Sequence, residues 1–414
     1  MSWRRKLIPR SAPMLLLVLT VGAVAGFAAV GHLVTRYTLN QQARGRKLYY
    51  LGVADANAGR YDDAIAAFRA ALSCDPTNSQ YQLSLARVLR DSDDPGRLDE
   101  AESYLLALWQ RTPQDAAVNL ALARVAAHRG AIEDATRYYH NAMYGVWNSD
   151  PDGNRNRARI ELIQFLLQKH ALAQADSELI ALTTALPPDP AAHLQTAELF
   201  EAAQDHSGAL AQYQVVLHFE PENPTALAGA GESAYRAGNY SEAEHYLHSA
   251  VQADAHDLEA KRLLDLTDLI LASNPFHGHI SDAERNRRIT ADFVQAEDRL
   301  ILCANQTGVQ LDVTKDSDSK DDATGNPKSE PSHNSKKENI QTAPASPLPD
   351  LQARWLEAKS QLKLLRSPAE TDLPDAIMDV VFQIEQQTAS ICGQPQGRDL
   401  ALMMISQKRE ASAQ

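Results

Sequence analysis

Between residues 45 and 257 the sequence repeats one pattern six times, at a spacing of about 34 residues. Each copy places small residues where two helices would cross and a larger apolar residue four positions further on. Most copies end in a turn that contains proline. The clearest copy, LYYLGVADANAGRYDDAIAAFRAALSCDP, contains Gly52, Ala64, Phe68 and Pro76 at these places. Because one such pair of helices cannot bury its apolar side alone, the pattern predicts an array of stacked pairs.

The six copies resemble the tetratricopeptide repeat, a helix–turn–helix unit that stacks into a superhelix and presents a groove to other proteins. The resemblance implies an all-α fold and protein binding without catalysis. The fourth copy is degenerate, since His170 stands where the pattern has glycine. We expect repeats at 45–78, 79–115, 116–149, 156–189, 190–223 and 224–257, followed by a capping helix at 258–273.

The resemblance also implies that the first helix of each pair lines the groove. Arg87, Arg90 and Arg124 would then make its near end cationic and able to bind a carboxylate of a peptide, although ordinary surface arginines fit the same pattern. The family's carboxylate clamp for chaperone tails is not implied, because Tyr49 and Val53 occupy its early positions. The predicted lining is Tyr49, Asn57, Arg87, Arg90, Arg124, His128, Gln164, Gln168, Glu198, Glu232, Tyr235 and Arg236.

Residues 12–34 contain no ionised side chain if His32 is neutral, and a helix of this length can cross a hydrocarbon core of roughly 30 Å. A cleaved signal peptide is the competing interpretation, because Ala23-Val24-Ala25 fits a cleavage site. The apolar run continues past that site, which favours an uncleaved transmembrane helix with residues 1–11 as a cytoplasmic tail. Basic residues flank the segment equally, so the positive-inside rule decides little. The short basic tail and the cysteines favour an exported domain.

The distribution of charge and of small residues along the sequence indicates which partners the chain can bind. Residues 1–47 hold eight basic and no acidic residues, and the remainder holds 32 basic and 53 acidic residues, a net charge of −21. An acidic body of this kind argues against nucleic-acid binding. The bilayer is the expected partner of residues 12–34. Gly22 and Gly26 form a G-x-x-x-G pair through which two copies could dimerise.

The composition changes after the repeats. Residues 304–349 are rich in Asp, Ser, Lys, Asn and Pro and are predicted to be a disordered linker. A helix at 281–303 and further helices within 350–409 are expected to pack together as a small bundle, from which the linker loops out. Cys303 and Cys392 end two of these helices. A disulfide between them would suit an exported compartment, with two buried thiols as the alternative, and Cys74 is left over.

No phosphate loop, nucleophile elbow or zinc helix occurs in the sequence. His277 and His279 form an H-x-H pair, but two ligands do not make a closed metal site. Neither a metal nor a cofactor is therefore predicted, and no catalytic residue can be named.

The expected function is a non-enzymatic scaffold anchored in the plasma (inner) membrane by a single pass, with most of the chain periplasmic. It resembles bacterial inner-membrane repeat proteins that assist secretion, envelope assembly or cytochrome maturation. The alternatives are a periplasmic chaperone-like accessory of secretion or envelope assembly, an enzyme whose C-terminal bundle is catalytic, and a purely structural spacer.

Overall fold

The computed structural model describes residues 12–92, 94–278, 280–311, 346–366 and 372–413. Over these residues the regular structure is helical except for one isolated bridge between Asp115 and Val146, so the predicted all-α class is confirmed. The chain divides into two compact units. The first holds residues 1–188 and 202–204, and the second holds 189–201 and 205–414.

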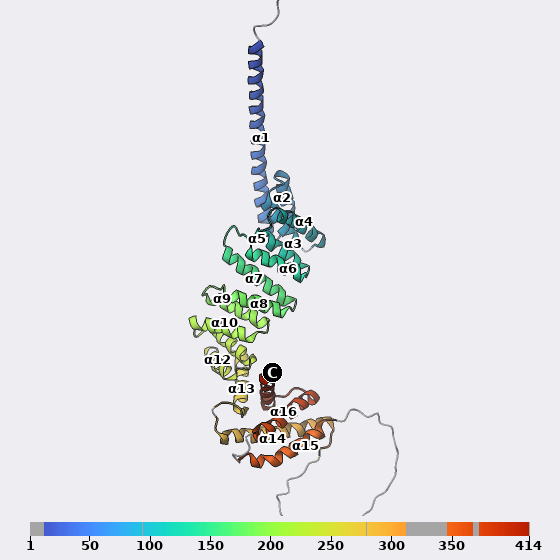
Figure 1. Cartoon of the computed structure of the whole chain (residues 1–414), viewed down its shortest axis with the longest axis vertical. Coiled ribbons are helices and arrows are strands. Elements are labelled where there is room, and N and C mark those ends of the chain that lie inside the picture. Colours follow the sequence, from blue (N-terminus) through green and yellow to red (C-terminus); the bar gives the residue numbers. More distant parts are fainter. Residues whose placement is uncertain (1–11, 93, 279, 312–345, 367–371, 414) are drawn as a thin grey trace, which may run out of the picture. The chain divides into compact units, whose positions relative to one another are not determined.

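The first unit begins with α1 (Ala12–Asn57), one helix of 46 residues. It runs from the predicted membrane segment into the first repeat without a break (Figure 1). Its apolar side chains near the start are exposed, with Phe27 at 87%. Among the described residues α1 is the one helix long and apolar enough to cross a membrane, a test that a signal sequence also passes. The predicted tail at 1–11 lies outside the described residues.

Seven more helices complete the first unit, and each packs on the next one along the chain, with α3 also touching α5. This order of contacts is that of stacked helix pairs. The helices are α2 (Tyr61–Cys74), α3 (Ser79–Asp91), α4 (Pro95–Arg111), α5 (Ala116–His128), α6 (Ile132–Tyr144), α7 (Pro151–Gln168) and α8 (Leu172–Thr183).

Small residues allow the paired helices to approach. A Cβ atom added to Gly52 would lie 2.8 Å from the ring of Phe68, closer than real Cβ contacts come. Phe68 fills the space that the glycine leaves and is only 1% exposed. Burying a side chain of this kind contributes about 1.5–3 kcal/mol to folding. The glycine and the phenylalanine of the sequence pattern are therefore one packing unit.

The turn inside several of the pairs contains a left-handed residue. Gly59 and Gly130 supply it with φ of 73°, which glycine adopts at little cost. In the degenerate fourth repeat His170 adopts φ of 55° at the same place, at a cost of about 1 kcal/mol for a residue with a Cβ. The turn thus persists although its glycine is missing.

The helices start at polar caps that follow the turns between pairs. The Asn78 side chain accepts a hydrogen bond from the Tyr81 amide at 3.2 Å, and Asp115 accepts bonds from the Ala117 and Val118 amides. Such caps satisfy amides that have no partner inside the helix. They fix where α3 and α5 begin.

The second unit contains two helix pairs, a further helix and a bundle. The pairs are α9 (Pro190–Ala202) with α10 (His206–Phe219), and α11 (Pro224–Arg236) with α12 (Tyr240–Ala253). They are followed by α13 (Leu258–Ser273), which packs on α11 and α12 at the place predicted for the capping helix.

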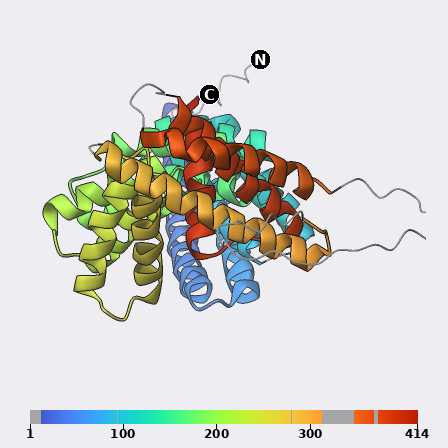
Figure 2. The same cartoon turned by 90° about the horizontal axis from the view of Figure 1, so that it is seen from below.

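The bundle consists of α14 (Asp282–Thr307), α15 (Leu348–Gln361), a short 3-10 helix η1 (Leu362–Arg366), α16 (Leu373–Cys392) and α17 (Gly397–Ala413). In Figure 2 the amber α14 lies across the red helices α16 and α17, with which it is in contact. The helix predicted at 281–303 continues to Thr307, where Gly308 ends it with φ of 71°. Of the predicted linker, residues 312–345 lie outside the described residues.

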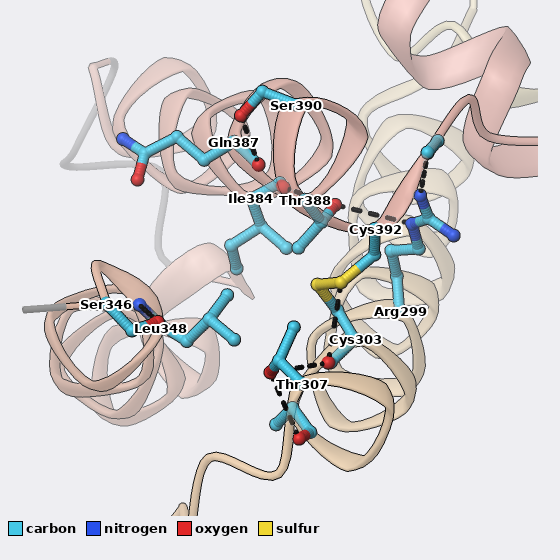
Figure 3. Close-up of a disulfide and its surroundings, with 12 residues drawn as sticks. Arg299, Cys303, Thr307, Ser346, Leu348, Ile384, Gln387, Thr388, Ser390 and Cys392 are labelled. Atoms are coloured by element: carbon cyan, nitrogen blue, oxygen red, sulfur yellow. Dashed lines mark hydrogen bonds between the residues drawn. A yellow bond between two sulfur atoms is a disulfide. The ribbon is translucent and has the colours of Figure 1, made fainter. Parts of the chain in front are cut away.

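The bundle core has an aromatic centre and a covalent link. The rings of Phe293 and Trp355 stack with centroids 5.0 Å apart. Cys303 at the end of α14 and Cys392 at the end of α16 form a disulfide, with their Cα atoms 5.6 Å apart (Figure 3). Beside it, Arg299 donates to Thr388 Oγ1 at 3.3 Å and to the carbonyl of Gly393 at 2.7 Å.

The bundle also contains buried carboxyl groups. Asp292 is fully buried and accepts hydrogen bonds from Arg398 at 2.7 and 3.0 Å. Glu385 is fully buried as well, and neither of its oxygens has a hydrogen-bond partner. Burial raises the pKa of Glu385 from 4.5 to about 8 and, against the effect of Arg398, the pKa of Asp292 from 3.8 to about 7.

Helix α17 attaches the bundle to the last repeat by packing on α13. The Tyr235 hydroxyl of α11 donates to Met404 Sδ at 2.8 Å, and Lys408 donates to the carbonyl of Gly238. Leu266 and Ile270 of α13 belong to the same buried core as the bundle. The capping helix is therefore itself covered by the C-terminal bundle.

Candidate protein-binding surface

At the start of the repeats, α1 and α3 form an aromatic cluster. The rings of Tyr49 and Tyr81 stack with centroids 5.0 Å apart. The Tyr49 hydroxyl accepts hydrogen bonds from Gln80 Nε2 at 3.1 Å and from Ser84 Oγ at 3.4 Å. Asn57, also predicted to line the groove, is exposed near the end of α1. Tyr49 therefore serves helix packing as well as the surface.

The three predicted arginines come together on α3 and α5. Arg90 binds the carboxylate of Asp91 through Nε at 2.7 Å and Nη2 at 2.5 Å. Arg124 makes a two-pronged bond to Glu161 of α7, at 2.8 and 2.6 Å. Arg87 forms no ion pair with any described residue. We call Arg87, Arg90 and Arg124 the arginine cluster.

The cluster is partly shielded from water. Arg87 Nε and Arg90 Nη1 are buried and have no hydrogen-bond partner. Burial lowers the pKa of Arg87, and the like charges of Arg124 and Arg90 lower it further. The bond to Glu161 raises the pKa of Arg124 despite burial. Among the described residues, Arg87 is thus the one cation of the cluster that forms no ion pair.

A hollow of about 340 Å³ opens beside the cluster. It takes in five of the predicted groove residues, because the first helices α3, α5 and α7 all contribute to it. Burial, followed by the charge of Glu161, raises the pKa of Tyr139 in its wall to about 12, so that hydroxyl stays protonated. The lining is Arg90, Arg124, Ala127, His128, Tyr139, Glu161, Gln164, Phe165 and Gln168.

Sequence reasoning missed four residues of the hollow, Ala127, Tyr139, Glu161 and Phe165, and of these Glu161 could have been found. Glu161 lies one helical turn before Gln164, so the spacing that selected Gln164 and Gln168 also selects it. Tyr139 occupies a packing position of the third repeat. It comes from the second helix α6, and no pattern showed that it would reach the first-helix surface.

The predicted lining residues of the second unit are arranged differently. Glu232 and Arg236 pair with each other on α11 at 2.5 Å, and Glu198 is exposed on α9. Tyr235 is the departure from the prediction. It packs against the bundle core and contacts Met404, so α17 covers a side chain that we expected to face a partner.

The described residues offer no metal centre, since no three His, Cys, Asp or Glu side chains among them gather closely enough. His277 Nε2 lies 3.3 Å from the Ser241 hydroxyl. His279, the other member of the H-x-H pair, lies outside the described residues. The arrangement of the arginine cluster and hollow is suited to binding.

Comparison with known families agrees with the repeats. Residues 33–153 match the family described as the cytochrome c-type biogenesis protein H TPR domain, and residues 201–266 match a tetratricopeptide repeat family. The chain is a helical-repeat protein. The repeats in these two segments are similar to tetratricopeptide repeats, a class that mediates binding between proteins.

Individual relatives are distant. The cellulose synthase operon protein C of Escherichia coli is 24% identical over 210 residues, which is 51% of this chain and 18% of that protein. The chain thus spans less than a fifth of the length of the two Escherichia coli relatives that it matches. Among solved structures, Pseudomonas aeruginosa pilF has 18% identity over 54% of this chain and 97% of its own, with a TM-score of 0.37. PilW, titled a type IV pilus biogenesis factor, has 17% identity over 53% of this chain and 98% of its own, also with a TM-score of 0.37.

Proposed function

We propose that this chain is a membrane-anchored scaffold that holds a segment of a partner protein on the first helices α3, α5 and α7. The arginine cluster and its hollow carry the proposal. This surface contains buried hydrogen-bond donors without a described partner, and its concavity is lined by three successive first helices. Both features are typical of a surface that binds a ligand. The scaffold itself performs no catalysis.

The anchor in this proposal is the part of α1 at residues 12–34, with the repeats on the exported side of a bacterial inner membrane. Since α1 is continuous, the anchor would hold the first repeat near the bilayer on a stiff helix. A Cβ atom added to Gly22 or Gly26 would meet no described atom of another part of the chain within 4 Å, which leaves both positions available for the proposed contact between two copies.

The process we propose is the assembly of an exported protein in the cell envelope. The match to a cytochrome c-type biogenesis family covers residues 33–153. It therefore includes the whole of α3 and α5 and the second half of α1. Maturation of c-type cytochromes is therefore the first process to test.

Photocrosslinking in intact cells tests the docking surface. A photoreactive residue replaces Gln164 or Gln168 on α7 in the full chain, and for comparison Gln110 on α4 or Gln174 on α8, which are equally exposed glutamines on second helices. We expect one partner, the same from both α7 positions, and none above background from the controls. Equal capture from first and second helices, or capture from the second helices alone, would refute the proposed surface.

A further inference from the structure

Among the described residues, the arginines of the cluster outnumber the carboxylates that form ion pairs with them. The arginine cluster brings three cations, and Asp91 and Glu161 bring two carboxylates, each bound to one arginine. One positive charge is left, and it lies on Arg87, which has no ion pair with a described residue. The described residues thus form two arginine–carboxylate pairs, and Arg87 is an arginine without a carboxylate partner.

An uncompensated guanidinium in this position is unfavourable. Arg87 is half-buried, its Nε is buried without an acceptor, and two other arginines lie nearby. A shielded donor without an acceptor costs free energy, and like charges in a poorly hydrated place repel. An incoming anion would remove both costs at once, so the site favours a ligand with one negative charge.

The kind of anion follows from charge and shape. A single carboxylate matches the excess of one positive charge, whereas a phosphate dianion would exceed it. A run of acidic residues would be repelled, because the chain beyond residue 47 has a net charge of −21. The hollow extends along α5 and α7 past the arginines to Ala127, Phe165 and Gln168. Arg87 lies beside the hollow and is not part of its lining, so a peptide anchored on Arg87 can continue from there into the hollow along α5 and α7.

We propose that one Asp or Glu side chain of the partner segment binds Arg87 and completes a third arginine–carboxylate pair beside Arg90–Asp91 and Arg124–Glu161. This inference rests on the proposed function and adds the chemistry that selects the segment. The planar guanidinium offers a fork of donors to the carboxylate. Phe165 supplies an apolar wall and the Gln164 and Gln168 amides supply bonds to the segment's backbone.

The test uses the segment crosslinked at Gln164, identified by mass spectrometry and synthesised as a peptide. Its affinity for the full chain in detergent is measured by calorimetry, for the wild type, for Arg87→Gln and for Arg137→Gln as a matched control. Arg137 is 60% exposed on α6 and pairs within its own helix. We expect Arg87→Gln to weaken binding by about 10- to 100-fold, as loss of a shielded charged hydrogen bond does, and the control to leave it unchanged.

Three altered peptides identify the group that binds. A peptide in which the Asp or Glu is changed to Asn or Gln should bind the wild-type protein as weakly as the original peptide binds Arg87→Gln. For this altered peptide, Arg87→Gln should cause no further loss of affinity. Amidation of the peptide's C-terminus should change nothing, and phosphoserine at the acidic position should bind more weakly. A loss on amidation, or tighter binding of the phosphoserine peptide, would overturn the proposal in favour of a chain end or a phosphate.

Unfolding of the ligand-free chain separates binding from folding. Because Arg87 forms no ion pair with a described residue, Arg87→Gln should leave the unfolding midpoint unchanged or raise it, and a lower midpoint would assign Arg87 a structural role instead. If Gln164 captures no segment, the proposed function fails and this inference fails with it. If a captured segment binds but ignores both Arg87→Gln and loss of its own carboxylate, only this inference fails.

Discussion

Cys303→Ala should destabilise the C-terminal bundle by about 4–5 kcal/mol, because the disulfide closes a loop between residues 89 positions apart and its loss restores the entropy of the unfolded chain. Cys303 lies in the buried core and links α14 to α16. The loss should therefore appear in the transition that unfolds these helices. Urea unfolding of the full chain, followed through Trp355 fluorescence, measures it.

Cys74→Ala is the matched control, because Cys74 is the one cysteine of the three outside the disulfide. It should leave the bundle's transition unchanged. A reducing agent should shift the wild type to the midpoint of Cys303→Ala and leave that variant unaffected. A wild-type midpoint that does not respond to reductant would show that the two cysteines do not stabilise the bundle by a covalent link.

Raising the pH from about 5 to about 8 should destabilise the bundle progressively. The folded state holds the proton of Glu385 with a pKa of about 8 and that of Asp292 with a pKa of about 7, whereas ordinary values are 4.5 and 3.8. The unfolded chain thus releases these protons at lower pH than the folded chain does. Stability that is present in acid is lost as the pH rises through the raised values.

Glu385→Gln should remove most of the decrease in unfolding free energy with rising pH. Because the amide cannot ionise, the bundle of this variant should be more stable than that of the wild type at alkaline pH. Glu357→Gln is a suitable control, since Glu357 is exposed on α15 in the same bundle. Urea midpoints at several pH values compare the variants. An equal slope in wild type and Glu385→Gln would mean that this carboxyl is not buried in its neutral form.

The repeat architecture could be predicted because its determinants are local. Gly52 and Phe68 meet across one turn, and Asn78 and Asp115 cap helices within three residues of themselves. Interactions of this range leave a fixed spacing in the sequence. Even where His170 replaces glycine, the neighbouring spacings still locate the turn.

The contacts of the C-terminal helices could not be predicted in the same way. Tyr235 and Met404 are separated by 169 residues, and an apolar helix face does not specify which surface will cover it. Glu385 follows Ile384 in an apolar helix, although a carboxylate side chain is usually exposed. Its burial depends on α14 and α17 packing around α16, which is long-range information.

For the binding surface, the sequence located the arginines through the helix period but not their ion pairs. Arg124 and Glu161 are 37 residues apart on different repeats, so their pairing depends on the stacking geometry. The same holds for Arg87, whose lack of a counter-charge becomes visible only when its neighbours are placed. The cationic surface was therefore predictable, and its single unpaired charge was not.

Hydrogen–deuterium exchange of the full chain, with and without the partner captured at Gln164, tests most directly whether the first helices hold that partner. The predicted result is slower exchange in α3, α5 and α7 on binding, with α4, α6 and α8 little changed. Protection limited to α4, α6 and α8, or to the C-terminal bundle, would contradict it.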